Sequence, residues 1–111
     1  MWYLVLSRTL KHGDAKQPHY DAHREWLEAQ HRAGRALFSG PSTDDQYGIY
    51  VLLAPNLAEA QSLAAEDPYH ALGDRMLEQV LEWSPRRAMR MEGPSIDELE
   101  AMARGGGGAS R

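Results

Sequence analysis

Two residues far apart in the sequence, His23 and Asp67, could together transfer a proton at neutral pH. A carboxylate that accepts a hydrogen bond from one imidazole nitrogen fixes the tautomer and makes the other nitrogen more basic. Both residues also have ordinary interpretations, because a histidine can lie at the polar rim of a helix and an aspartate before a proline is typical of a helix end. The pair supports a catalytic hypothesis without naming a substrate.

His23 lies in the first helix that the sequence predicts. Apolar and small residues recur at intervals of three and four from Ala22 onward, which is helical spacing. Asp21 can cap the start of this helix, and Gly34 suits the left-handed position that ends many helices. We therefore expect residues 8–19 to form a loop and His23 to lie in the first helical turn.

Asp67 lies at the end of the second predicted helix. Asn56 can cap the start of this helix, and its apolar residues share one face (Leu57, Ala60, Leu63 and Ala64). Asp67 ends it because the residue before a proline is pushed out of the α region. Residues 68–72 can add one short turn that stops at Gly73.

Four segments favour strands. Residues 2–7, 36–39 and 47–54 are rich in β-branched, aromatic or apolar residues, and turn residues such as Gly40 and Pro41 separate the second from the third. Residues 76–83 are compatible with a helix or a strand, and topology favours a strand over 77–83, which residues 87–91 could extend.

The resulting order β-α-β-β-α-β is the ferredoxin-like split pattern, with an antiparallel four-stranded sheet. If the first and third strands are antiparallel neighbours, the two helices are antiparallel too, and the start of one lies beside the end of the other. This topology predicts that His23 lies near Asp67. Ser42 and Tyr69 directly adjoin the motifs around these segments and are candidate substrate contacts. No nucleophile elbow is present, so a Ser-His-Asp triad is not implied.

The C-terminal part carries little core-forming sequence. We expect a domain over residues 1–91, a helical extension over 92–104 that Ser95 caps, and a disordered glycine-rich tail over 105–111.

Composition bounds the function class. A chain of 111 residues with 42% hydrophobic and 25% charged residues suits one globular domain. The net charge of −4 gives no support for nucleic-acid binding, and the absence of cysteine excludes thiol chemistry. The apolar run at residues 2–6 is too short for a signal sequence or a membrane span, so we expect a cytoplasmic protein with no membrane partner.

Histidines elsewhere leave a metal site open as an alternative. His19 and His23 have i, i+4 spacing, and His12 or His31 could complete a site. His19 precedes the predicted helix and no acidic partner is fixed, so we expect neither a metal nor an organic cofactor.

The sequence resembles the YciI (YCII-related) family over residues 2–84. The resemblance rests on an ordered set: His23 and Leu27, Gly34-Arg35, Gly40-Pro41, Leu57 with Ala60, and Asp67-Pro68-Tyr69 with Gly73. It implies a ferredoxin-like fold that pairs into a dimeric α+β barrel, and a catalytic dyad that carries over to His23 and Asp67. Most members of this family have no assigned reaction. A few similar proteins remove chloride from chlorinated hydroxyquinols, and muconolactone isomerases and small cofactor-free monooxygenases share the fold.

This chain departs from the short members in its long loop at 9–19, its charged segment after His23 and its tail after Trp83, which leaves the substrate open. We expect a cofactor-free acid-base enzyme of the isomerase, lyase or dehydrohalogenase type that acts on a cyclic or aromatic-derived small molecule. The alternatives are a non-catalytic dimeric ligand-binding or accessory protein, and a cofactor-free oxygenase or metal enzyme. A four-stranded sheet with helices on one face leaves an apolar face that predicts a homodimer or a higher even oligomer.

Overall fold

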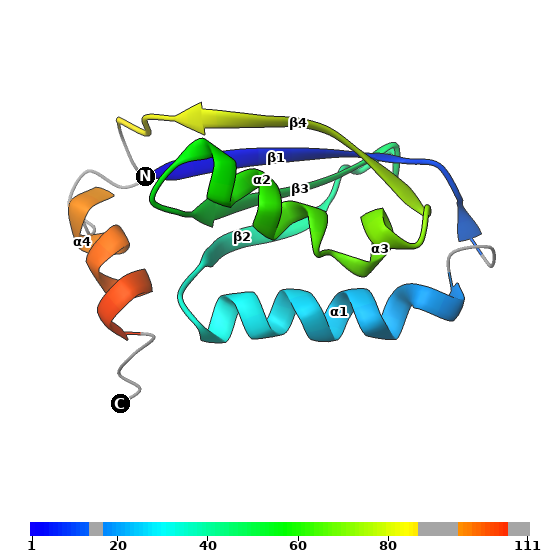
Figure 1. Cartoon of the computed structure of the whole chain (residues 1–111), viewed down its shortest axis with the longest axis horizontal. Coiled ribbons are helices and arrows are strands. Elements are labelled where there is room, and N and C mark those ends of the chain that lie inside the picture. The colour runs from blue at the N-terminus through cyan, green and yellow to red at the C-terminus, as the bar shows by residue number, and fades with distance from the viewer. Residues whose placement is uncertain (14–16, 87–95, 107–111) are drawn as a thin grey trace.

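The computed structural model describes residues 1–13, 17–86 and 96–106 (Figure 1). The elements in chain order are β1 (Trp2–Thr9), α1 (Gln17–Arg32), β2 (Ala36–Pro41), β3 (Tyr47–Leu53), α2 (Leu57–Ala65), α3 (Pro68–Ala71), β4 (Arg75–Trp83), α4 (Ile96–Ala101) and a π-helical turn (Met102–Gly106).

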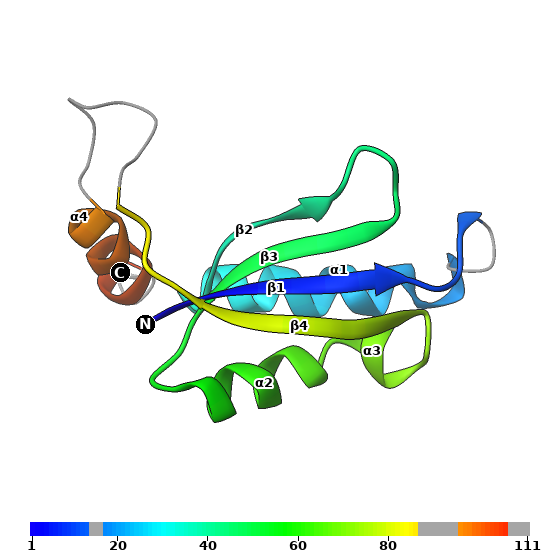
Figure 2. The same cartoon turned by 90° about the horizontal axis from the view of Figure 1, so that it is seen from above.

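The sheet has the strand order β2-β3-β1-β4, with every neighbouring pair antiparallel. β1 is central, and its Val5 lies opposite Tyr50 of β3 and Val80 of β4. Figures 1 and 2 show α1 and α2 on the same side of this sheet. The predicted ferredoxin-like α+β fold is thus confirmed, and β1 and β3 are the antiparallel neighbours on which the predicted proximity of His23 and Asp67 depends.

The hydrophobic core lies between the sheet and the two long helices. Alternate strand residues point to this side, where Val5, Tyr50 and Leu52 pack with Ala64 of α2. Trp26 of α1 packs against this cluster and meets the Tyr50 ring edge-on, with ring centroids 6.0 Å apart. The large aromatic side chains of this cluster carry much of the hydrophobic stabilisation.

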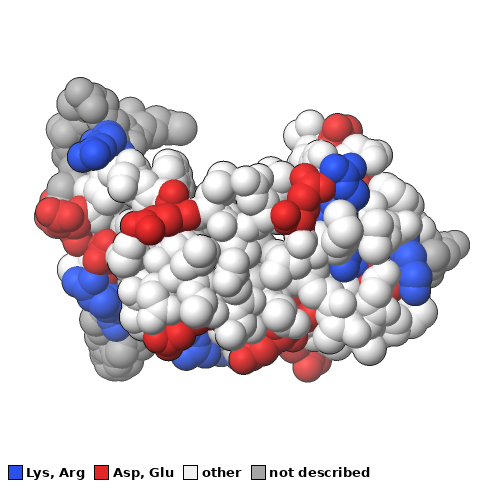
Figure 3. Space-filling view, turned by 45° about the horizontal axis from the view of Figure 1, so that its top comes forward, with Lys and Arg blue, Asp and Glu red and all other residues white. Residues whose placement is uncertain are grey.

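The opposite face of the sheet carries several exposed apolar side chains. Leu4 lies opposite both Val51 and Leu81, and the side chain of Leu81 is half-exposed. Other large hydrophobic residues of the strands are exposed as well (Phe38, Ile49, Met76 and Trp83). On the face that Figure 3 displays, acidic and basic side chains form small separate groups with uncharged surface between them.

The start of α1 differs from the sequence prediction. The helix begins at Gln17 instead of after a cap at Asp21, and β1 continues to Thr9, so the predicted loop over residues 8–19 is much shorter. Pro18 indicated a loop, but a proline is compatible with the first helical turn, where its missing N–H has no partner to lose. His23 consequently lies in the second turn of α1 rather than the first.

Several other boundaries follow from the sheet topology. β2 continues through Gly40 to Pro41, where the sequence predicts a turn. An edge strand tolerates a proline because its outer side needs no ladder hydrogen bond. The ambiguous segment is a strand as predicted and starts at Arg75. The side chain of Asn56 accepts a hydrogen bond from the backbone N–H of Glu59, which confirms the predicted cap of α2.

The C-terminal helical turn meets the chain just after the end of α1, on the side of the molecule where Figure 1 shows α4. Gly34 has a φ of 76°, and a Cβ atom at this position would come within 1.7 Å of the Ala103 carbonyl oxygen. Gly34 is therefore needed both to end α1 and to admit this contact. The helical turn continues to Gly106, two residues past the predicted boundary. The predicted strand extension at 87–91, the cap at Ser95 and residues 107–111 of the predicted tail lie outside the described residues.

Candidate active site

His23 and Asp67 are in direct contact. The His23 Nδ1 atom lies 2.7 Å from Oδ1 of Asp67, and both residues are buried. A carboxylate can only accept in this contact, so Nδ1 carries the hydrogen and Nε2 is the nitrogen with a free lone pair. The structure thus brings together the two residues that topology had placed side by side.

Asp67 is held by three donors from different elements. Its Oδ1 accepts hydrogen bonds from His23 and from the backbone N–H of Tyr69, at 2.9 Å, and its Oδ2 accepts from the Tyr50 hydroxyl at 3.2 Å. The bond to Tyr69 makes Asp67 the N-cap of α3, because a proline follows and the next free N–H belongs to Tyr69. This arrangement fixes the carboxylate with no exposed surface.

The Tyr69 ring stacks on the face of the His23 ring and orients it. The two rings stack with centroids 4.0 Å apart and an interplanar angle of 13°. Contacts at Nδ1 and on the ring face leave the imidazole edge that carries Nε2 as the part available to a ligand.

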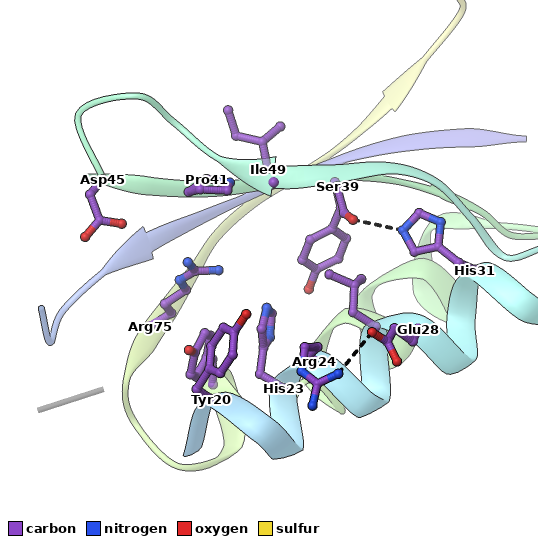
Figure 4. A pocket seen from close by; sticks show the side chains of 14 residues that line it. Tyr20, His23, Arg24, Glu28, His31, Ser39, Pro41, Asp45, Ile49 and Arg75 are labelled. Atoms are coloured by element: carbon purple, nitrogen blue, oxygen red, sulfur yellow. Dashed lines mark hydrogen bonds and ion pairs between the residues drawn. The ribbon is translucent and has the colours of Figure 1, made fainter. Parts of the chain in front are cut away.

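A pocket of about 400 Å³ lies beside this edge, between α1 and the strands β2 and β3. Figure 4 shows His23 rising from α1 into it, with Tyr20 and Arg75 on one side and Ser39 and His31 on the other. Besides these, its lining includes Leu27, Pro41, Ile49, Tyr50 and Tyr69. Most of the lining surface is apolar, which is typical of small-molecule sites. Charged side chains border it as well, among them Arg24, Glu28 and Asp45.

Burial sets the protonation of the two tyrosines next to Asp67. Burial raises the pKa of Tyr50 far above its usual value, and the charge of Asp67 and the hydrogen bond to it raise it further. Burial is also the main cause that raises the pKa of Tyr69. Both phenols therefore stay protonated at neutral pH, and Tyr50 remains a hydrogen-bond donor to Asp67.

The two predicted substrate contacts, Tyr69 and Ser42, lie in different places. Tyr69 lines the pocket, whereas Ser42 does not belong to its lining. The Ser42 hydroxyl donates to Asp44 at 2.7 Å and accepts from the Tyr47 backbone N–H at 3.0 Å, so it stabilises the β2–β3 turn.

The histidines considered for a metal lie in separate places. His12 is 3.6 Å from Asp45, His19 is 2.5 Å from Asp74, and His31 is 2.8 Å from the Ser39 hydroxyl. Within residues 1–13, 17–86 and 96–106, no three His, Cys, Asp or Glu side chains gather in a metal-binding cluster. No helix in the same ranges has the length and apolar character to cross a membrane.

Sequence reasoning missed three polar features around the site. One is the second histidine–aspartate contact, His19 with Asp74. Another is a Ser7–His70 contact of 2.5 Å, in which the His70 Nδ1 donates to the Ala64 carbonyl oxygen, so that Nε2 accepts from Ser7. The third is Arg75, which lines the pocket at the start of β4. Successive side chains of a strand point to opposite faces of the sheet. The positions of Ser7 in β1 and Arg75 in β4 could therefore have indicated that both face the helices.

Comparisons with known proteins agree with the fold. Residues 1–84 match the family described as YCII-related domain. The chain is similar to the uncharacterized protein YjpA of Bacillus subtilis (strain 168), with 31% identity over 85 residues, covering 77% of this chain and 99% of that protein. Among solved structures it is similar to the 5-chloro-2-hydroxyhydroquinone dehydrochlorinase TftG of Burkholderia phenoliruptrix AC1100 in complex with 2,5-dihydroxybenzoquinone. The TM-score is 0.61 at 23% identity, over 76% of this chain and 94% of that one, so this likeness concerns the fold.

Proposed function

The chain belongs to the YCII-related family, and on this premise we propose that it is an enzyme that moves protons on a small molecule by acid-base chemistry. His23 is the base, and Asp67 is the acid that orients it. The single observation that carries this proposal is a buried histidine–aspartate contact of 2.7 Å whose histidine lines a pocket. Perturbed or paired ionisable groups in a pocket are typical of functional sites.

The proton-transfer step uses the lone pair of His23 Nε2. This nitrogen takes a proton from a C–H or O–H group of the substrate, and the imidazolium that forms is stabilised by the Asp67 carboxylate. Tyr50, which stays protonated, and the Tyr69 backbone N–H hold the carboxylate in place during the step. No group other than these side chains is needed to accept or hold the proton.

Three reaction types use this step. In an isomerase, the imidazolium returns the proton to another atom of the substrate. In a lyase or dehydrohalogenase, the electron pair of the broken bond forms a double bond and expels a leaving group, which is halide in the second case. The aromatic lining favours a flat, cyclic or aromatic-derived substrate. TftG, the structural neighbour, is a dehydrochlorinase crystallised with a dihydroxybenzoquinone, and this supports a substrate of that class.

We propose that the working unit is a homodimer in which the exposed apolar faces of two sheets pack together. The half-exposed Leu81 and Trp83 and the exposed Phe38 make this face unfavourable in water. Light scattering at micromolar concentration should give the mass of a dimer or a higher even oligomer. A monomer under these conditions would contradict the barrel.

Turnover can be tested without knowing the substrate. A panel of hydroxyquinones and their chlorinated forms, incubated with the protein in D₂O, is followed by NMR for deuterium uptake and by ion chromatography for chloride release. His23→Asn should lower the rate about 10²–10⁴-fold, since a positioned base contributes this much. His31→Asn is the matched control, because it is on the same helix and lines the same pocket but contacts a serine. It should lose at most a few-fold.

A non-catalytic ligand-binding protein is the second candidate. The His23–Asp67 contact joins α1 to the start of α3, and Asp67 also caps α3, so the pair has a structural role of its own. A binding protein of this kind would bind members of the panel without exchange or chloride release, and His23→Asn would lower its melting temperature by many degrees.

A further inference from the structure

Arg75 is a buried cation inside the pocket that the reaction described above does not use. It is the first residue of β4, it is only 7% exposed, and it lies in the pocket lining together with His23. Figure 4 shows its side chain reaching from the strand toward the space above Tyr20 and His23.

The guanidinium occupies a place built for it. Its carbon atom lies 4.8 Å from the centre of the Tyr69 ring, a cation–π contact. On another side it lies against Gly48 of β3, where a Cβ atom would come within 2.1 Å of Nη1. The backbone angles at position 48 do not require a glycine. The guanidinium does, because a side chain at this position would occupy its place.

The buried guanidinium lacks a direct anionic partner in the part of the chain that the structure describes. Arg75 forms no ion pair there, and its buried Nε has no hydrogen-bond partner. Two buried carboxylates are near it in sequence or space, but Asp67 is bonded to His23 and Tyr50, and Asp74 to His19 and Lys11. Two further carboxylates line the same pocket, and these are paired elsewhere, Glu28 with Arg24 and Asp45 with His12. A buried charge without a partner is unfavourable, so the site favours a ligand that supplies the negative charge.

We propose that Arg75 binds an anionic oxygen of the substrate, which makes the substrate a small planar organic anion. The proposal rests on the proposed function in that the pocket with His23 is taken as the substrate site. A guanidinium offers several N–H donors in one plane and matches an oxygen anion on a flat carbon framework. The anionic oxygen is either a carboxylate or an ionised enol or phenol.

This placement links anion binding to the proton transfer. When His23 removes a proton next to a carbonyl group or from a hydroxyl group, negative charge develops on an oxygen of the substrate. A cation that is already fixed in the pocket stabilises this charge without reorganisation. Arg75 and His23 contact the same tyrosine ring, so Tyr69 sets their relative position.

Direct binding tests the proposal independently of turnover. Benzoate and 4-nitrophenolate are titrated at pH 8 into ¹⁵N-labelled protein, with benzamide as the neutral counterpart of benzoate. The arginine Nε–H signals report which guanidinium responds. We expect at least one anion to bind at least tenfold more tightly than benzamide, with the largest shift at Arg75. Binding of benzoate alone identifies a carboxylate site, and binding of 4-nitrophenolate alone identifies a site for an ionised enol or phenol.

Two variants locate the anion. Arg75→Met should weaken binding at least tenfold, and Gly48→Ala should weaken it several-fold with the net charge unchanged, because its Cβ displaces the guanidinium. Gly48→Ala also keeps the test open if Arg75→Met does not fold. Arg8→Met is the matched control, since Arg8 is also a strand arginine that lies over a tyrosine ring, but it is paired with Glu78 and does not line the pocket. It should change binding less than twofold.

The possible outcomes separate this inference from the proposed function. Equal binding of the anions to the wild type and to the Arg75 and Gly48 variants, or no preference over benzamide, overturns the anion site. Anion binding that depends on Arg75 in a protein that never exchanges a proton supports the anion site and contradicts the enzyme. Exchange that depends on His23 but is unaffected by Arg75→Met overturns the anion site alone.

Discussion

Among the described residues, two histidine–aspartate contacts join α1 to the two ends of the segment around α3, and they differ in their surroundings. The inner pair, His23 with Asp67, links α1 to the start of α3, and the outer pair, His19 with Asp74, links the preceding turn of α1 to the residue after Gly73. Both aspartates are fully buried. The side chain of His23 is 11% exposed, whereas that of His19 is 31% exposed.

The neighbours of the two carboxylates differ more than the histidines do. Asp67 is bonded otherwise only to neutral donors, Tyr50 and a backbone N–H. Asp74 lies 3.4 Å from the half-exposed ammonium group of Lys11. The histidine of the inner pair lines the pocket and that of the outer pair does not. On the proposed function, the same two residue types serve proton transfer in the inner pair, whereas in the outer pair they only join α1 to the residue after Gly73.

The largest expected difference between the pairs is in turnover. Asp67→Asn keeps the size of the side chain, but its amide can donate to His23 Nδ1 and so place the ring hydrogen on Nε2. An imidazole protonated on Nε2 cannot accept the substrate proton, and we expect turnover to fall about 10²–10⁴-fold. ¹⁵N chemical shifts of the ring nitrogens report the tautomer directly.

The same change in the outer pair is the control. Asp74→Asn should leave turnover within a few-fold, since His19 does not line the pocket. Equal losses in the two variants would mean that the amide substitutions act through the fold, and the inner pair would then have no special role.

The two carboxylates should also differ in how much their removal lowers the free energy of unfolding. Asp67→Ala leaves a buried histidine and the buried hydroxyl of Tyr50 without their acceptor, and it removes the cap of α3. We expect a decrease of about 3–5 kcal/mol in the free energy of unfolding, measured by urea denaturation. Asp74→Ala should cost about 1 kcal/mol, because water can replace the carboxylate at the partly exposed His19 and Lys11. A larger loss at Asp74 would reverse the comparison.

Tyr50 contacts the inner pair only, and its titration makes the stability of the fold sensitive to alkaline pH. Its pKa is raised in the folded protein, mainly by burial, so the neutral phenol stabilises the fold at pH values below the ordinary value of 10.0. Above that pH the unfolded chain releases this proton and the folded chain keeps it, so the free energy of unfolding falls as pH rises, by about 1.4 kcal/mol per pH unit for one proton.

Tyr50→Phe should remove this part of the alkaline decline and cost about 1 kcal/mol at pH 7, where it deletes one hydrogen bond. Urea denaturation of both proteins at pH 7, 10 and 11 gives the two slopes. Burial also raises the pKa values of Tyr3 and Tyr69, so both proteins keep other sources of alkaline decline and only the difference between their slopes is diagnostic. Parallel slopes would show that Tyr50 has the same pKa in the folded and in the unfolded chain.

The sequence predicted the inner pair because topology alone determines it. Strand and helix patterns gave the order of elements, and the antiparallel neighbours β1 and β3 then required the two helix ends to meet. The outer pair was missed because Pro18 indicated a loop, which removed His19 from the helix. Proximity in sequence was a poor guide to proximity in space. Pro41 lines the pocket, whereas the next residue, Ser42, is engaged in the turn.

Tyr50 and Arg75 could not be assigned from the sequence, because their roles depend on strand register and on side-chain packing. Tyr50 reaches Asp67 only because it faces the helices from β3, and a tyrosine in an apolar strand is otherwise a core residue. Arg75 begins a strand whose secondary structure was ambiguous, so its direction was open. Its contact with Gly48 of β3 requires the side chain to reach across β1, which lies between β4 and β3.

The smallest expected effect concerns Lys11, the charged neighbour that only the outer pair has. Its ammonium group is half-exposed, so its attraction to Asp74 is weakened by solvent and by salt. Lys11→Met should lower the free energy of unfolding by about 0.2–1 kcal/mol at low ionic strength, and this difference should vanish in 1 M NaCl. Urea denaturation at the two salt concentrations measures both values. A loss above about 1.5 kcal/mol that persists in high salt would show that Asp74 needs a permanent cation. The outer pair would then be an ion-paired cluster that differs from the inner pair in kind, and not only in its exposure to water.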